Sequence, residues 1–312
     1  MGYTISSIGL CNDQEHIMAE DNSKIKKILR TLRVKQWVKN SFIFFPLIFS
    51  GRLFTPGFLM LSVKTFLGFC LAASSVYILN DFFDHKRDHL HPKKSKHVPD
   101  YRKINKACIG SAILLLLAAG LMICQTVNTR VTHTVIAYIA INIVYNLAVK
   151  NIVILDVLFI ALGFQLRIWA GSMAIGVFPS AWLQMCVFLL ALFLGFTKRR
   201  NELSILKDRA AEYKPVLTHY TVYLLDQIII ICSTLAIVFY GLYTLSPEII
   251  HRVGSQKMIY SVTFVIYGIF RYLYLVHTKH KGDDPGEILF SDMPFIICML
   301  AWIFYIGILI YH

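Results

Sequence analysis

Three carboxylates follow a long apolar stretch and have the spacing of residues on one face of a helix. Asp81, Asp84 and Asp88 come directly after residues 58–79, a run long enough to cross a bilayer, which takes about 20 residues. In a continuing helix, offsets of three and four place these side chains on one face, with Asn80 at its edge. Like charges repel one another, so this face favours a site for a hard cation such as Mg2+, shared with a substrate phosphate. A solvated polar face just outside the membrane is the alternative.

The composition is that of a membrane protein. Hydrophobic residues make up 56% of the 312 positions and charged residues only 16%, unlike an ordinary soluble domain. About nine apolar segments approach the length of a bilayer crossing. The short linkers between them predict an all-α, polytopic protein with these transmembrane helices in one bundle. The segments cover residues 38–52, 58–79, 106–126, 131–148, 153–173, 180–198, 222–245, 258–277 and 292–311.

The basic residues predict the orientation of the chain in the inner or plasma membrane. If the N-terminus is cytoplasmic, most of the 31 Lys and Arg residues fall on the cytoplasmic side, and the outer loops hold only Arg52, Arg130, Arg252 and Lys257. The positive-inside rule therefore favours a cytoplasmic N-terminus and a C-terminus outside. The net charge of +13 then describes one basic membrane face, suited to anionic lipids and phosphorylated substrates, and not a nucleic-acid-binding surface.

Two short regions precede the predicted membrane domain. Residues 1–23 are polar and of mixed charge, without the basic start and apolar core of a signal peptide, which predicts a flexible cytoplasmic tail. Residues 24–36 interleave basic and apolar side chains, which predicts an amphipathic helix on the membrane surface. Residues 37–312 then form one transmembrane catalytic domain. The seven cysteines have no CxxC spacing and no predicted function.

Further polar side chains are placed by this topology at the same membrane face as the carboxylates. The lysines and arginines among them could bind phosphate oxygens that are not coordinated by a metal ion. Ordinary positive-inside charge and helix-end anchoring are the alternatives for the lysines and arginines. The candidate substrate-binding residues are Lys35, Lys39, Asn80, Lys94, Tyr145, Lys150, Arg167, Lys198, Arg199, Arg200 and Glu202.

Arg167 differs from the other candidates because it lies several turns into an apolar span. A charge at that depth costs at least ~2.5–3.5 kcal/mol on insertion scales and usually faces a cavity or a partner. A structural ion pair with an acidic residue is the alternative to substrate binding. Asp156, at the start of the same span, also fits as the N-terminal charge of a helix.

The carboxylate motif, within about nine spans, resembles the UbiA superfamily of intramembrane prenyltransferases. The resemblance covers nearly the whole chain, residues 32–311. In typical members, two Asp-rich motifs on opposing helices hold Mg2+ around a prenyl diphosphate. Here the cations of residues 198–200 replace the second motif, which favours direct contact with anions over a second metal ion. The resemblance implies that the catalytic and metal-binding residues are Asp81, Asp84 and Asp88.

Several further segments agree in order with one branch of that superfamily. They are Leu32-Arg33-x-Lys35-Gln36-Trp37-x-Lys39-Asn40, Tyr145 through Lys150 to Asp156, Gly163-Phe164-x-Leu166-Arg167 with Ala170-Gly171, and Lys198-Arg199-Arg200-x-Glu202-Leu203. In these segments the chain resembles decaprenyl-phosphate phosphoribosyltransferases. The resemblance implies a Mg2+-dependent transfer of 5-phosphoribose from phosphoribosyl pyrophosphate to a polyprenyl phosphate in the bilayer, with release of pyrophosphate. Residues 97–99 depart from the branch, since they read His-Val-Pro where members tend to have Arg-Pro-Ile.

Two other functions stay open on the sequence alone. A conventional UbiA-type prenyltransferase would move a prenyl group from a prenyl diphosphate to an aromatic or other small acceptor, but the missing second acidic motif disfavours it. A transporter would use Arg167 and the carboxylates as a path for ions or substrate, but its polar sites should continue through the bilayer. We therefore expect a transferase with its active site on the cytoplasmic face.

Overall fold

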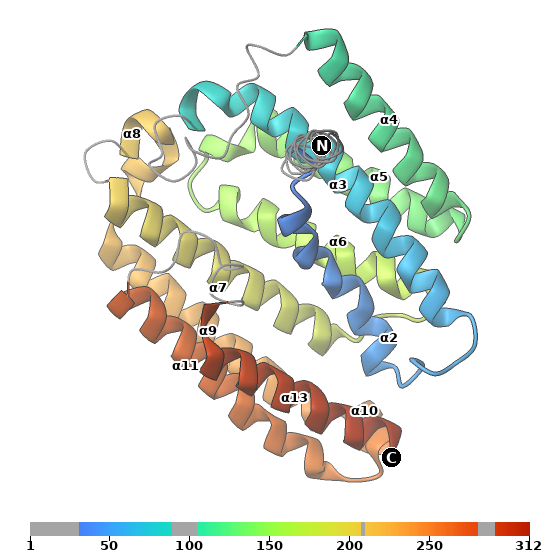
Figure 1. Cartoon of the computed structure of the whole chain (residues 1–312). Coiled ribbons are helices and arrows are strands. Elements are labelled where there is room, and N and C mark those ends of the chain that lie inside the picture. Colours follow the sequence, from blue (N-terminus) through green and yellow to red (C-terminus); the bar gives the residue numbers. More distant parts are fainter. Residues whose placement is uncertain (1–30, 89–104, 207–209, 280–290) are drawn as a thin grey trace, which may run out of the picture.

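The chain folds into a bundle of long helices that run back and forth between two ends (Figure 1). The computed structural model describes residues 31–88, 105–206, 210–279 and 291–312, apart from the side chains of residues 85–88, 211 and 279. No strand occurs in these ranges, so the predicted all-α class is confirmed. The predicted tail, residues 1–23, and Lys94 lie outside the described residues. The elements are η1 (Val34–Phe44), α2 (Phe45–Phe49), α3 (Phe58–Asp88), α4 (Lys106–Gln125), α5 (Thr129–Leu147), η4 (Val149–Asn151), α6 (Leu155–Ala174), α7 (Ala181–Leu206), α8 (Ala210–Tyr213), η6 (Pro215–His219), α9 (Val222–Thr244), α10 (Pro247–Val253), η7 (Gln256–Ser261), α11 (Val262–Lys279) and α13 (Met293–Tyr311).

Seven helices in the described part of the chain are long and apolar enough to cross a membrane. They are α3, α4, α6, α7, α9, α11 together with η7, and α13. The other two predicted spans have counterparts in α5, whose Thr, His and Asn residues lower its hydropathy, and in η1 followed by α2. The predicted bundle is therefore present, with two crossings less apolar or less regular than the rest.

The first predicted span is not a single α-helix. Residues 34–44 wind as the tight 3-10 helix η1, a form that is uncommon beyond three or four residues. Two hydrogen bonds tie its start to α3, because Trp37 Nε1 donates to Ser74 Oγ at 3.0 Å and Ser74 Oγ donates to the carbonyl of Leu32 at 2.7 Å. Residues 32–37 are thus packed on α3, and η1 crosses the predicted boundary at residue 36.

Helix α6 lies in the middle of the bundle, between two clusters of buried side chains (Figure 1). Val157 belongs to the cluster shared with α7 and α9, and Ala170 to the cluster shared with η1 and α3. Gly171 lets η1 approach α6 closely, because a Cβ there would lie 2.0 Å from the carbonyl oxygen of Ile43. Helix α6 therefore fixes the position of η1, which carries part of the predicted site.

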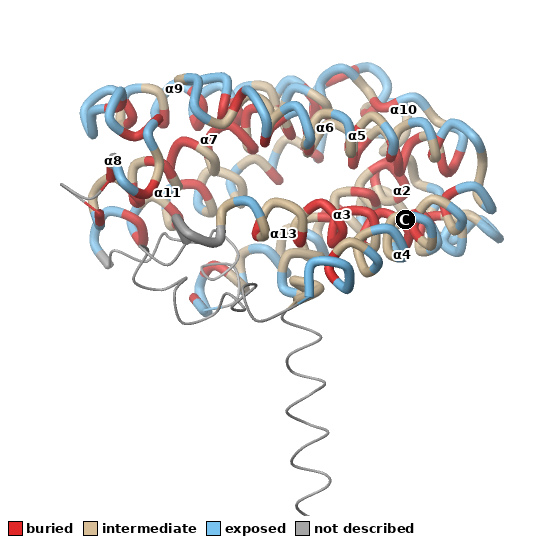
Figure 2. Tube along the Cα trace, turned by 90° about the horizontal axis from the view of Figure 1, so that it is seen from above, coloured by how far each residue is buried: buried red, intermediate tan, exposed pale blue. Residues whose placement is uncertain are grey.

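Large apolar side chains cover the outside of the bundle. Leu115 on α4 is 71% exposed and Phe304 on α13 is 70% exposed. Exposed residues line the outer sides of the helices, whereas buried residues face inward (Figure 2). Apolar surface of this extent suits lipid and not water.

The two ends of the bundle carry different segments. The C-terminal end of α3, η4, the start of α6, the end of α7 and α8 form one end, here called the carboxylate end. Helices α2 and α10 and the link between α6 and α7 lie at the opposite end, here called the far end (Figure 1).

Candidate active site

Helix α3 continues without interruption to Asp88, as the spacing of its carboxylates predicts. Asp81 is buried and Asp84 is half-buried at this end of the helix, while the side chain of Asp88 lies outside the described part. Among the described residues, no group of three His, Cys, Asp or Glu side chains lies close enough to hold a metal ion. The described carboxylates of α3 are therefore a pair, one turn apart.

Two cations from distant segments pair with these carboxylates. The guanidinium group of Arg33, just before η1, bonds to Asp81 Oδ1. The Nζ atom of Lys150, in η4, lies 2.7 Å from Asp84 Oδ1. These pairs bring two other predicted motifs to the end of α3. They also reduce the repulsion that two neighbouring carboxylates would otherwise have.

Asn80, which directly precedes Asp81 in the sequence, has a side-chain oxygen without a hydrogen-bond partner in the described part of the chain. Its Oδ1 atom is buried and accepts no hydrogen bond from the described residues. A buried carbonyl oxygen without a donor is costly, so such an atom indicates a missing partner. Oxygen ligands are the kind that Mg2+ prefers. Asn80, Asp81 and Asp84 therefore fit such an ion in ligand type, with Arg33 and Lys150 sharing the two carboxylates.

A second charged cluster is buried where α6, α7 and the segment after α8 meet. Arg199 is 2% exposed, with Nε 2.6 Å from Asp156 Oδ2 and Nη1 2.8 Å from Glu202 Oε2. Lys214 Nζ lies 2.9 Å from Glu202 Oε1. Two carboxylates and two cations therefore balance one another. Arg199 and Glu202, both predicted to bind substrate, are engaged by side chains of the protein itself.

Tyr220 connects this cluster to the turn before α6. Its hydroxyl donates to Asp156 Oδ1 at 2.9 Å and accepts the backbone N–H of Ile154 at 2.6 Å. Burial raises the pKa of Tyr220, so the hydroxyl stays protonated and continues to donate. Ile154 has a φ of 68°, which is strained for a β-branched residue and persists only where the surroundings enforce it. Tyr220 therefore ties the turn between Lys150 and α6 to the buried cluster.

The remaining candidates at the carboxylate end have mixed environments. Arg200 Nε lies 2.5 Å from Asp226 Oδ1 at the partly exposed junction of α7 and α9. Tyr145 interacts with the buried Arg199. Helix α8 packs against α3, which places the segment of Lys214 beside the carboxylate helix. Lys35 is exposed, and the candidate cations Lys39, Lys150, Lys198 and Arg200 are half-buried.

Arg167 is buried and hydrogen-bonded inside the bundle. Its Nε donates to Asn40 Oδ1 at 2.7 Å, its Nη1 to the carbonyl of Gly163 at 2.7 Å, and its Nη2 to Tyr138 Oη at 3.2 Å. Aromatic rings surround the guanidinium carbon at 4.8 to 5.3 Å. No carboxylate of the described residues pairs with it, so the ion-pair alternative is not what the structure shows. Through Asn40, Arg167 fixes η1 against α6.

Lys214 and Tyr220 belong to the site but are not among the residues predicted from the sequence. Lys214 ends a basic stretch that begins at residue 198, and this shared stretch is a signal that could have included it. Tyr220 gives no comparable signal, because a tyrosine at the start of an apolar span also fits an anchor at the membrane interface. Asp156 occupies the first turn of α6 as predicted, and it also pairs with Arg199.

The fold and this arrangement define an integral membrane protein with a charged site at one end of its helical bundle. Residues 43–291 match the UbiA prenyltransferase family, and the chain belongs to that family. The expectation drawn from the sequence motifs is thereby confirmed.

Two bacterial relatives are similar to the chain over almost its full length. The chain is 28% identical over 297 residues to decaprenyl-phosphate phosphoribosyltransferase of Mycolicibacterium smegmatis, covering 92% of this chain and 93% of that protein. It is 28% identical over 310 residues to the protein of the same name from Corynebacterium glutamicum, covering 94% and 91%. A solved UbiA homologue from Archaeoglobus fulgidus, bound to GPP and Mg2+, matches with a TM-score of 0.66 and 18% identity, over 91% of this chain and 99% of that chain. That structure supports the fold.

Proposed function

We propose that this protein transfers the 5-phosphoribosyl group of phosphoribosyl pyrophosphate to a polyprenyl phosphate and releases pyrophosphate. Relatives named for decaprenyl-phosphate phosphoribosyl transfer match more than nine tenths of the chain. The observation that carries the proposal is a set of ion pairs that joins the carboxylate motif and three of the four further segments of this branch. The pairs are Arg33–Asp81, Lys150–Asp84 and Asp156–Arg199.

A Mg2+ ion at the end of α3 would suit the pyrophosphate of the donor. Asp81, Asp84 and Asp88 would hold it, with Asn80 at the edge, and the ion would neutralise charge on the departing pyrophosphate. The unpartnered, buried Oδ1 of Asn80 supports this assignment. The Mg2+ in the Archaeoglobus fulgidus homologue supports it for the family's fold.

The cations around the carboxylates would bind phosphate groups directly. Arg33 and Lys150 have N–H groups beyond those used by the carboxylates, because a guanidinium has five and an ammonium three. Binding of the donor's 5-phosphate and of the lipid phosphate is assigned to Lys35, Lys39, Tyr145, Lys198 and Arg200. The sequence motif adds Lys94, which lies outside the described residues.

The buried cluster would act by position. Arg199 and Glu202 hold Asp156 and Lys214, and Tyr220 holds the turn that presents Lys150. Arg167 would keep η1, and with it Lys35 and Lys39, against the core through Asn40. No contact with substrate is assigned to these paired charges.

The transfer needs little proton chemistry from the protein. The bond between C1 of the ribose and a pyrophosphate oxygen breaks, and a bond forms between C1 and an oxygen of the lipid phosphate. A phosphate monoester carries about −1.5 to −2 charges near neutral pH, so its oxygen can attack without a general base. Catalysis would then consist of positioning the two substrates and stabilising charge.

The orientation of the chain in the membrane is part of the proposal. The carboxylate end holds Arg33, Lys150 and the cations of residues 198–200, whereas few basic residues occur at the far end. The positive-inside rule then places the carboxylate end and the N-terminus in the cytoplasm, where phosphoribosyl pyrophosphate would reach the site. Residues 37–312 would form the catalytic domain behind the N-terminal tail and the interfacial segment.

The test is transfer of label from donor to lipid. Purified protein in nanodiscs is incubated with ribose-labelled phosphoribosyl pyrophosphate and a polyprenyl phosphate, with and without Mg2+. Label should enter the lipid fraction only when the metal is present. Absence of a metal-dependent lipid product would refute the proposal. Transfer of a prenyl group from GPP to an aromatic acid would instead support the prenyltransferase alternative.

A further inference from the structure

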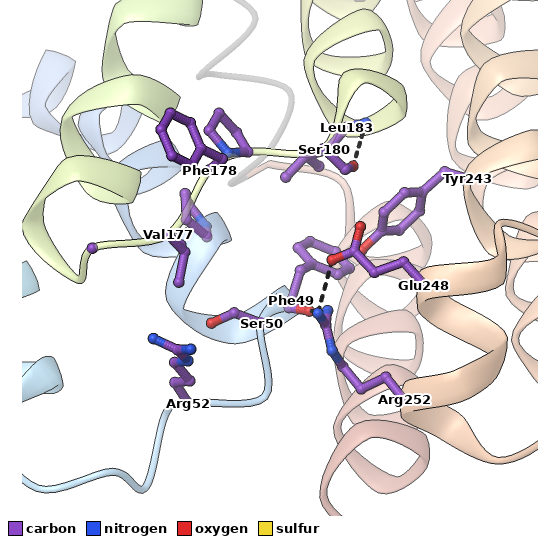
Figure 3. A pocket seen from close by; sticks show the side chains of 13 residues that line it. Phe49, Ser50, Arg52, Val177, Phe178, Ser180, Leu183, Tyr243, Glu248 and Arg252 are labelled. Atoms are coloured by element: carbon purple, nitrogen blue, oxygen red, sulfur yellow. Dashed lines mark hydrogen bonds and ion pairs between the residues drawn. The ribbon is translucent and has the colours of Figure 1, made fainter.

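A cavity of about 340 Å³ lies at the far end of the bundle, away from the carboxylates. Three separate segments form its walls, namely the end of α2 with the turn after it, the link between α6 and α7, and α10 with the end of α9 (Figure 3). Its volume is at the lower end of the roughly 300–1,000 Å³ that small-ligand pockets have. The size suits a phosphate with a short attached group.

Two arginines give the cavity a positive charge. Arg252 is fixed in place, because it donates to the carbonyl of Phe49 and lies 2.9 Å from Glu248 Oε1. Arg52 has no carboxylate partner among the described residues, and its guanidinium lies 5.6 Å from the ring of Phe58. One glutamate and two arginines leave a surplus of one positive charge. Figure 3 shows Arg52 and Arg252 on either side of Ser50.

These arginines are unusual for the face on which they lie. The outer loops contain only four Lys or Arg residues in the predicted topology, and two of them line this one cavity. Two hydroxyl groups, of Ser50 and Ser180, also line the wall. Guanidinium and hydroxyl groups together are the donors that recognise phosphate oxygens.

The surroundings of the cavity indicate that its ligand also has an apolar part. Phe178 lines the wall and is 81% exposed, and Phe54, in the turn after α2, is 78% exposed. Large apolar side chains exposed on a membrane bundle offer a surface that suits lipid chains and not water. A molecule held here can therefore place its phosphate between the arginines while its acyl chains extend along the apolar outside of the bundle.

We propose that this cavity binds the phosphate headgroup of an anionic phospholipid, as a second site separate from the carboxylate end. Arg52 and Arg252 contact the phosphate, and Phe178 and Phe54 contact the start of the acyl chains. The site does not depend on the proposed transferase activity, because it uses neither the residues nor the end of the bundle assigned to that reaction.

The test compares Arg52→Gln with Arg130→Gln. Both changes remove one exposed positive charge at the far end, since Arg130 lies in the first turn of α5, but only Arg52 lines the cavity. Native mass spectrometry of detergent-solubilised protein is used to titrate short-chain phosphatidylglycerol. Arg52→Gln should weaken binding about tenfold or more, the effect of losing one hydrogen bond between charged groups. Arg52→Lys should retain part of the affinity, and Arg130→Gln should bind like the unmodified chain.

Three outcomes would overturn the proposal. Equal binding by Arg52→Gln and the unmodified chain would show that the cavity does not hold the headgroup. Equal weakening by Arg130→Gln would show a general effect of charge at this face. Glycerol 3-phosphate, which has no acyl chains, is titrated in the same way. If it binds the unmodified chain as tightly as phosphatidylglycerol does, the cavity binds a soluble phosphate ester and not a lipid. Melting temperatures of the variants check that each one is folded.

Discussion

Removing the charge of Asp156 should destabilise the protein strongly. In Asp156→Asn, Arg199 loses one of its two carboxylate partners while its side chain stays 3% exposed. Breaking a buried ion pair by changing one partner costs about 3–5 kcal/mol, because it leaves a charge without compensation. Glu202 still pairs with Arg199 but is shared with Lys214, so we expect the lower end of this range. About 3 kcal/mol corresponds to a change of about 100-fold in the unfolding equilibrium.

The matched control is Asp226→Asn on α9, the helix that packs against α7. Asp226 also pairs with an arginine of α7, but the side chains of Arg200 and Asp226 are 15% and 32% exposed. A pair in contact with solvent contributes about 0–1 kcal/mol, so this variant should unfold almost like the unmodified chain. Both substitutions replace the same carboxylate by the same amide, and they differ mainly in burial.

Reversible unfolding in mixed detergent and SDS micelles, followed by tryptophan fluorescence, measures both variants. A double variant that adds Arg199→Gln to Asp156→Asn should lose less stability than the sum of the two single changes, because no unpaired cation is left. If Asp156→Asn and Asp226→Asn lose the same free energy of unfolding, the cluster is not a buried, charge-balanced unit. In that case Arg199 would be free to bind a phosphate.

Two further predictions concern the chemistry and the packing. Asp84→Asn should lower turnover at least 100-fold, because Asp84 is assigned to the metal site. Its melting temperature should not change, because Asp84 is only half-buried. Turnover at the wild-type rate would show that Asp84 has no part in the mechanism. Gly171→Ala should destabilise the fold by about 1–3 kcal/mol or more, because its Cβ would lie 2.0 Å from the Ile43 carbonyl oxygen. The control is Gly307→Ala, because a Cβ added at Gly307 meets no atom within 4 Å. This variant should be as stable as the unmodified chain or slightly more stable. Equal effects of the two substitutions would contradict the close contact between η1 and α6.

The long spans were predictable from the sequence because the bilayer imposes both their length and their apolar composition. The predicted segment 106–126 corresponds to α4 at Lys106–Gln125, and 222–245 corresponds to α9 at Val222–Thr244. The continuation of α3 to Asp88 was predictable from the spacing of its carboxylates. The form of η1 was not, because contacts with Ser74 on α3 and with Gly171 on α6 shape it.

The partners within the site were beyond what the sequence could predict. Arg199 and Asp156 are separated by 43 positions, and their contact depends on how α6 and α7 are rotated against each other. A row of cations at a helix end therefore resembles a phosphate site whether or not its members are already paired. In the structure the two differ in burial, since Arg199 is buried between carboxylates whereas Lys198 is partly exposed.

We propose that the carboxylate end of this UbiA family member binds phosphoribosyl pyrophosphate and not a prenyl diphosphate as its donor. A competition experiment offers the substrates of both reactions at once, with phosphoribosyl pyrophosphate, polyprenyl phosphate, GPP and 4-hydroxybenzoate in equal amounts with Mg2+. Mass spectrometry of the lipid extract then identifies the product. We expect polyprenyl phosphate carrying one added phosphoribosyl group, and no such product from Asp84→Asn. Prenylated hydroxybenzoate as the main product, with the polyprenyl phosphate unchanged, would contradict it.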